Sequence, residues 1–77
     1  MDQDFEFLKE WLVADIAKML IQKTGMTTID ALDAIYGSKT YGILSQKSTG
    51  LYYQSPKYVY TFLDDELRTG KFSFNEI

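Results

Sequence analysis

Apolar residues recur at helical spacing throughout the segment 4–23, DFEFLKEWLVADIAKMLIQK, which we predict to be the longest helix of the chain. Its broad apolar face comprises Phe5, Leu8, Leu12, Val13, Ile16, Met19 and Leu20. A narrower stripe on the opposite side comprises Phe7, Trp11, Ala14 and Ile21. A helix that is apolar on two sides must be covered on both sides, by the rest of the chain or by a partner.

Glycines and capping residues divide the middle of the chain into short helices. Gly25 is expected to end the first helix, because glycine readily adopts the left-handed conformation found there. Thr27 or Thr28 is predicted to cap a second helix, TIDALDAIY, which Gly37 ends. Ser38 is predicted to cap a short third helix, SKTYGILS. The residues predicted to face inward are Ile29, Leu32, Ile35 and Tyr36 in the second helix and Tyr41 and Leu44 in the third.

The last helix has the clearest start signal. After a loop at 46–50 and an extended segment at 51–53, Ser55 precedes Pro56, which is typical of an N-cap followed by the first helical residue. The helix PKYVYTFLDDELRT is then predicted to end at Gly70. Its predicted inner face comprises Val59, Phe62, Leu63 and Leu67, and its outer face Lys57, Thr61, Asp64, Asp65 and Arg68.

The tail KFSFNEI alternates Phe72 and Phe74 with polar residues, a pattern that indicates either a short strand or a strap over a helix. Taken together, the pattern predicts one all-α domain over residues 1–77. We expect a small helical bundle of three main helices plus one short helix, with the long N-terminal helix central.

The composition excludes several kinds of chemistry. The chain has no cysteine and no histidine, so it cannot form disulfides or thiolate sites and lacks the commonest general base and metal ligand. The acidic run 64–66 falls on a predicted helix, where consecutive side chains point about 100° apart, so we interpret it as a solvated face. We therefore expect no catalytic residues, no cofactor and no metal, and a protein that is not an enzyme. No small-molecule substrate is evident.

Charge and tyrosine content suggest an alternative function in the middle of the chain. Residues 34–63 contain three lysines, no acidic residue and all six tyrosines, although the net charge of the chain is −3. A small nucleic-acid-binding module could use this basic, Tyr-rich middle at residues 36–60. Its candidate residues are Lys39, Lys47, Lys57, Tyr41, Tyr52 and Tyr53. Against this alternative, no arginine precedes Arg68, and arginine is the usual reader of guanine.

The ends and apolar runs of the sequence bear on its location. The acidic start MDQDFE lacks the basic region of a signal peptide, and the longest apolar run is too short to span a bilayer. We expect a bacterial cytoplasmic protein that does not bind membranes.

The narrow stripe of the first helix is the candidate partner-binding surface, formed by Phe7, Trp11, Ala14 and Ile21. Tryptophan is strongly enriched at interface hot spots. Cover by the tail is the intramolecular alternative. The simplest intermolecular arrangement is an isologous dimer with the two copies of the helix antiparallel. The leading functional expectation is therefore a non-catalytic interaction protein that binds a protein partner or itself.

Two short passages carry a resemblance to a known family. The first reads S-x-T-Y-x-x-L and the second T-G-L-Y-x-Q-S-P-x-Y-V. The residues that match are Ser38, Thr40, Tyr41, Leu44, Thr49, Gly50, Leu51, Tyr52, Gln54, Ser55, Pro56, Tyr58 and Val59. This pattern resembles a family of small bacterial helical proteins of unknown function. The resemblance implies a small accessory protein encoded in a compact gene pair, sometimes beside a toxin-like partner, and it implies no catalytic residues.

Overall fold

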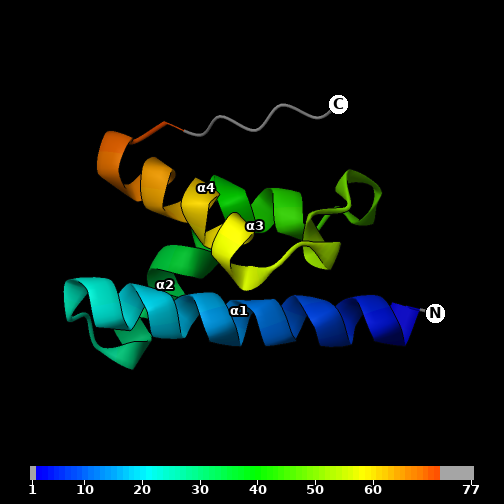
Figure 1. Cartoon of the computed structure of the whole chain (residues 1–77), viewed down its shortest axis with the longest axis horizontal. Coiled ribbons are helices and arrows are strands. Elements are labelled where there is room, and N and C mark those ends of the chain that lie inside the picture. Colours follow the sequence, from blue (N-terminus) through cyan, green and yellow to red (C-terminus); the bar gives the residue numbers. More distant parts are fainter. Residues whose placement is uncertain (1, 72–77) are drawn as a thin grey trace.

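The long helix α1 (Asp2–Thr24) is the element against which the rest of the chain folds. The structure, a computed structural model, describes residues 2–71, with side chains from residue 4 onward. Figure 1 shows α1 along the length of the molecule, with α4 (Pro56–Thr69) and α3 (Lys39–Leu44) in a layer above it. Helix α2 (Thr28–Tyr36) packs against both α1 and α3. Two short 3-10 helices, η1 (Lys47–Thr49) and η2 (Leu51–Tyr53), connect α3 to α4.

This architecture confirms the predicted all-α bundle of three main helices and one short helix. No strand occurs within residues 2–71. The predicted strand or strap of the tail, with Phe72 and Phe74, lies outside the described residues. None of the helices in the described part of the chain is long and apolar enough to cross a membrane.

The helix ends follow the predicted capping signals. The side-chain oxygens of Thr27, Ser38 and Ser55 accept hydrogen bonds from the backbone N–H groups three residues later. Each of these bonds satisfies one amide that the first turn of a helix leaves unpaired. Gly25 and Gly70, which follow α1 and α4, have positive φ angles of 79° and 75°. Glycine adopts this left-handed conformation without steric cost.

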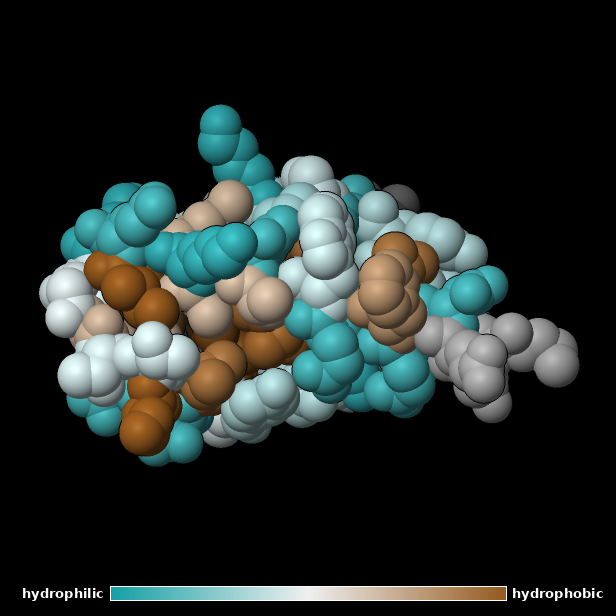
Figure 2. All heavy atoms as spheres, turned by 90° about the horizontal axis from the view of Figure 1, so that it is seen from below, coloured by the Kyte–Doolittle hydropathy of each residue, from teal (hydrophilic) through white to brown (hydrophobic). Residues whose placement is uncertain are grey.

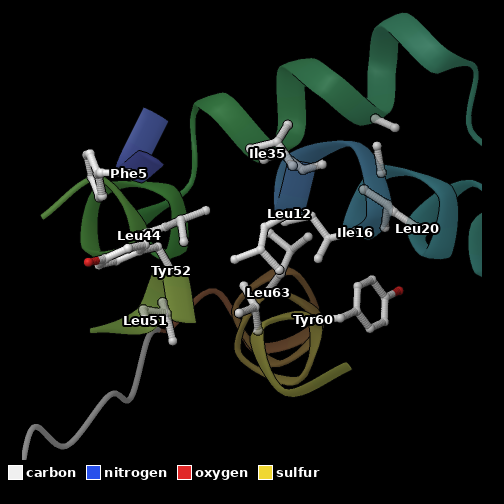
Figure 3. Close-up of a cluster of buried hydrophobic side chains, with 14 residues drawn as sticks. Phe5, Leu12, Ile16, Leu20, Ile35, Leu44, Leu51, Tyr52, Tyr60 and Leu63 are labelled. Atoms are coloured by element: carbon white, nitrogen blue, oxygen red, sulfur yellow. The ribbon is translucent and has the colours of Figure 1, made fainter. Parts of the chain in front are cut away.

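The broad face of α1 forms one wall of the hydrophobic core, as predicted. Leu12, Ile16 and Leu20 are almost completely buried, and Leu8 and Met19 pack against them at its edge. Figure 3 shows how the side chains of the other elements meet this face. The buried residues contributed by the other elements are Ala31, Ile35, Leu44, Leu51, Tyr52, Val59, Tyr60 and Leu63.

The predicted inner face of α2 is partly wrong. Ile35 is buried, but Ile29 is 72% exposed and Tyr36 is 46% exposed, and Ala31 takes the inward position instead. Ala31 and Ile35 are four residues apart and therefore lie on one line of the helix surface. Ala31 is completely buried although Ile29 is the more hydrophobic residue, so hydrophobicity alone did not indicate the inner face of this helix.

Helix α4 also turns a different line inward than the sequence predicted. Val59 and Leu63 are buried as expected. Leu67 is 41% exposed, however, and Tyr60, which was not assigned to the inner face, is buried. One turn beyond Leu63, the residue that faces α3 is Glu66, whose carboxylate contacts the first turn of α3. The last turn of α4 thus makes a polar contact where an apolar one was expected.

The segment 51–53 is a 3-10 helix and not the extended segment that the sequence predicted. Gly50 precedes it with φ of 72°, and the resulting turn is closed by a bond from the N–H of Tyr53 to the carbonyl of Gly50. One ring nevertheless lies on the core, as expected. Tyr52 packs edge-on against Phe5, with ring centroids 4.8 Å apart.

Candidate interaction surface

The face of α1 that points away from the core carries two large aromatic side chains. Phe7 is 68% exposed and Trp11 is 49% exposed, and Ala14, one turn further along, is also exposed. We call these three residues the α1 stripe. Figure 2 views the molecule from the α1 side and shows a small apolar patch toward the N-terminal end of α1, separated by pale and polar surface from a larger apolar area at the opposite end. Burial of exposed rings of this size is a large favourable term in association.

Ile21 was predicted to extend the α1 stripe but differs from its other members. Its side chain is half-buried and packs against the hydrophobic core. The chain turns at Gly25 and returns as α2 against α1, which explains why this end of the predicted stripe is covered. The structure therefore brings Phe7, Trp11 and Ala14 together on one exposed surface and places Ile21 at its margin.

Tyr36 at the end of α2 lies beside the α1 stripe. Its hydroxyl donates a hydrogen bond to a carboxylate oxygen of Glu10 on α1, at 3.5 Å. Its ring packs edge-on against Tyr41 of α3, with centroids 4.9 Å apart. Burial, together with the nearby Glu10 carboxylate, raises the pKa of Tyr36, so the hydroxyl remains a donor at neutral pH. The surface beside the stripe is thus aromatic and fixed by contacts to two helices.

The charges on α1 are separated along its length. Asp4, Glu6 and Glu10 are exposed in the N-terminal half, whereas Lys18 and Lys23 are exposed near the C-terminal end. This arrangement complements the helix dipole, which favours anions at the N-terminus and cations at the C-terminus. Of these residues, Glu10 lies beside the stripe, through its contact with Tyr36, whereas Lys23 lies on the side of α1 that faces α4.

Lys9 is a buried charge that the sequence pattern did not reveal. It is only 9% exposed, and its ammonium lies 3.2 Å from Glu6 and over the rings of Phe5 and Tyr41, at 5.4 and 5.6 Å from their centroids. Burial acts to lower the pKa of Lys9, but the contact with Glu6 and the nearby Tyr41 outweigh burial and raise it. Lys9 therefore stays charged. Its aliphatic stem is buried, and its ammonium lies over a ring of α1 and a ring of α3.

The candidate nucleic-acid residues do not form one exposed platform. Tyr52 is buried and Tyr41 is half-buried, while Tyr53 is 73% exposed with one face stacked on Tyr52. Of the three lysines, Lys39 begins α3, Lys47 begins η1 and Lys57 lies in the first turn of α4. A stacking platform for single-stranded nucleic acid needs several accessible rings beside cationic side chains.

The acidic run 64–66 divides between two different partners. Arg68 pairs with Asp64 at 3.2 Å and with Asp65 at 2.8 Å on the outer side of α4. Glu66 faces α3, where its carboxylate accepts hydrogen bonds from the N–H of Lys39 at 2.7 Å, the N–H of Thr40 at 3.0 Å and the hydroxyl of Thr40 at 2.8 Å. The three carboxylates therefore do not converge on one point.

Glu66 holds the first turn of α3, a role that the sequence pattern did not predict. Partial burial acts to raise the pKa of Glu66, but the two backbone N–H groups and the Thr40 hydroxyl outweigh it and lower the pKa. The sequence contains one indication of this contact: α3 has no acidic residue in its own first turn, where a carboxylate is favourable. A helix start without a local carboxylate can take one from elsewhere in the fold.

Comparison of the chain with models of protein families, with curated proteins and with solved structures finds no match. The resemblance of residues 38–67 to small bacterial helical proteins of unknown function stays a prediction.

Proposed function

We propose that this protein is a non-catalytic interaction protein that forms an isologous dimer through the α1 stripe. The observation that carries the proposal is the exposure of Phe7 and Trp11 on the outer side of a helix whose inner side is fully packed. Exposed aromatic residues of this size are typical of interface hot spots. A second copy of the chain is the occupant that we infer, for two reasons that follow from the order of residues along α1.

The first reason is charge complementarity between antiparallel copies. Glu10, whose carboxylate contacts Tyr36 beside the stripe, lies in the N-terminal half of α1, and the exposed Lys18 lies in the C-terminal half. In an antiparallel pair, the acidic half of each helix faces the basic half of its partner, whereas a parallel pair would place like charges together. Charge complementarity of this kind sets the orientation of helix pairs.

The second reason is complementarity of size. Trp11 and Ala14 are three residues apart on the same exposed line of α1. With the two-fold axis midway between them, Trp11 of each copy lies opposite Ala14 of the other. Close packing of a large side chain against a small one is typical of helix interfaces. The same register sets Phe7 opposite Lys18, whose aliphatic stem and ammonium both suit an aromatic ring.

Sedimentation equilibrium tests the dimer directly. We expect the wild type to approach twice the chain mass as its concentration rises, and Trp11→Glu to remain at the mass of one chain because a buried carboxylate would be unpaired. Tyr58→Glu is the matched control, since Tyr58 on α4 is 47% exposed, close to the value for Trp11. It should dimerise like the wild type. Far-UV circular dichroism verifies that each variant is folded.

Two results would contradict the dimer. A wild type that remains at the mass of one chain at about millimolar concentration, a regime in which even weak dimers form, would exclude self-association. Tryptophan emission that is already blue-shifted in such a monomer would show instead that Trp11 is covered within the chain. For the dimer, we expect a blue shift that develops only as the concentration increases.

The nucleic-acid alternative has a separate test. Non-specific binding to nucleic acid is strongest at low salt because it depends on release of counterions from phosphates. We expect no mobility shift of random single- or double-stranded DNA or RNA at low salt, because Tyr53 is the one candidate ring that is largely exposed. If the wild type does shift the mobility of the nucleic acid, and Lys39→Gln and Lys47→Gln weaken that shift, nucleic-acid binding would be favoured over the dimer as the main activity.

A further inference from the structure

A pocket lies between the C-terminal part of α1 and the N-terminal half of α4, remote from the α1 stripe. Its volume is about 440 Å³, and its lining includes Met19 and Lys23 from α1 and Lys57, Tyr60 and Asp64 from α4. The volume falls within the range typical of sites for small organic molecules. The sequence pattern does not indicate this site, because its residues meet only when α4 packs on α1.

The hydroxyl of Tyr60 is the unusual group in this pocket. Tyr60 is only 8% exposed, and its hydroxyl oxygen is buried without a hydrogen-bond partner among the described residues. Figure 3 shows the ring at the edge of the core cluster, with the hydroxyl directed away from Leu63 and Leu12. A buried polar group without a partner costs free energy and is rare in folded proteins.

Tyr60 is held in the form that can donate a hydrogen bond. Burial, reinforced by the nearby carboxylate of Asp64, raises the pKa of the Tyr60 hydroxyl, so it remains protonated at neutral pH. A protonated phenol offers one O–H to an acceptor in the pocket.

The charged groups around Tyr60 favour an anion. The ammonium of Lys23 lies over the Tyr60 ring, 5.9 Å from its centroid, and Lys57 lines the α4 side. Within residues 4–71, neither lysine forms an ion pair with another side chain. The only acidic group in the lining, Asp64, is already paired with Arg68 at 3.2 Å. Among the described residues, the pocket therefore has two lysines without an ion-pair partner beside one donor without an acceptor.

We propose that this pocket binds a small organic molecule that carries an oxyanion, either a carboxylate or a phosphate monoester, on an apolar body. The oxyanion would accept the Tyr60 O–H and lie between the two lysines, because hydrogen bonds to charged acceptors are the strong ones. The apolar body would contact Met19 and the Tyr60 ring, as in most sites for small molecules. This inference does not depend on the dimer, since the pocket uses a different side of α1.

Titration followed by ¹H–¹⁵N correlation spectra tests the site with two probes, phenyl phosphate and benzoate, each against sodium chloride at the same ionic strength. We expect saturable shifts of the backbone amides around residues 22–23 and 57–61 with at least one probe. The probe that saturates at lower concentration identifies the oxyanion. Loss of one hydrogen bond or charge contact to an anion weakens binding by about tenfold or more. We therefore expect that loss for Tyr60→Phe and for Lys57→Gln.

Lys71→Gln is the matched control, because Lys71 is an exposed lysine outside both the pocket lining and the α1 stripe. It should bind the better probe as the wild type does. The proposal is overturned if neither probe saturates, or if Tyr60→Phe and Lys57→Gln both bind with unchanged affinity.

Thermal unfolding gives an independent readout on Tyr60. Without a probe, Tyr60→Phe should unfold at the same temperature as the wild type or at a higher one, because it removes a buried hydroxyl that has no partner. Addition of the better probe should raise the Tm of the wild type and leave that of Tyr60→Phe nearly unchanged. A clearly lower Tm for Tyr60→Phe without a probe would mean that the hydroxyl is used within the fold, which would contradict the site.

Discussion

Replacement of Ile16 by alanine is expected to lower the free energy of unfolding by about 2–4 kcal/mol. Ile16 is completely buried at the centre of the broad face of α1, where Figure 3 shows it close to Leu12 and Leu63. The substitution removes the contacts of three carbons and leaves a cavity that a well-packed core cannot fill. Urea unfolding followed by circular dichroism measures the change. Leu12→Ala should behave in the same way, because Leu12 is equally buried.

The matched control for this prediction is Phe7→Ala on the opposite side of the same helix. Phe7 is larger than Ile16 but 68% exposed, so its removal should change the stability of the monomer by less than about 1 kcal/mol. Unfolding is measured at low micromolar concentration, where association contributes least. If Ile16→Ala does not fold, Ile16→Val should still lose about 1 kcal/mol. A larger loss for Phe7→Ala than for Ile16→Ala would show that the core lies on the other face.

Replacement of Glu66 by alanine is the second large effect, with an expected loss of about 1–3 kcal/mol in the free energy of unfolding. The substitution removes the acceptor of three hydrogen bonds from the first turn of α3. It also leaves the hydroxyl of Thr40, a residue that is 1% exposed, without that partner. Asp65→Ala is the neighbouring control. Asp65 is exposed and pairs only with Arg68 among the contacts described, so its loss should cost less than about 1 kcal/mol.

The contribution of Glu66 should also depend on pH. Its pKa is lower in the folded protein than in the unfolded chain, so the ionised form stabilises the fold. That stabilisation is present in full above the unfolded value of about 4.3 and is lost as the pH falls through the lower folded pKa. We therefore expect Glu66→Gln to be less stable than the wild type at pH 7 and closer to it at pH 3. An equal difference at both pH values would contradict the role of the charge.

Local signals predicted the helices and their ends well, because these features depend on neighbouring residues. Helix α1 has 23 residues, so the members of its broad face recur over several turns and can be recognised although a second apolar stripe lies opposite. The caps Thr27, Ser38 and Ser55 each bond an amide three residues away, within the reach of a sequence pattern. Such contacts require no knowledge of the tertiary fold.

The inner faces of the shorter helices were harder to predict. Helix α2 has nine residues, and a pattern of this length fits more than one rotation about the helix axis. Ile29 is more hydrophobic than Ala31, yet the smaller residue is buried because space between the helices decides which side faces inward. In α4, the buried residues also depend on the neighbouring helices. Tyr60 contacts Lys23 of α1, whereas near the other end of α4 it is Glu66, and not Leu67, that contacts the first turn of α3.

The polar features of the candidate sites depend on residues far apart in sequence, which no local pattern encodes. Glu66 bonds an amide 27 residues earlier, and the pocket joins Lys23 to Lys57 across two helices. The α1 stripe was predictable because all its members lie on one helix. Even there, the partial cover of Ile21 depends on how the chain returns into α2.

The contact between Glu66 and α3 has a consequence for the order in which the chain acquires its structure. Helix α3 has six residues, too few for a stable isolated helix in water, and its first turn depends on a side chain that follows it by 26 and 27 residues. During synthesis on the ribosome, α3 emerges before α4, whereas α1 and α2 can pair as soon as the short turn between them is complete. We therefore expect α3 to remain frayed at its start until the chain has been made past Glu66.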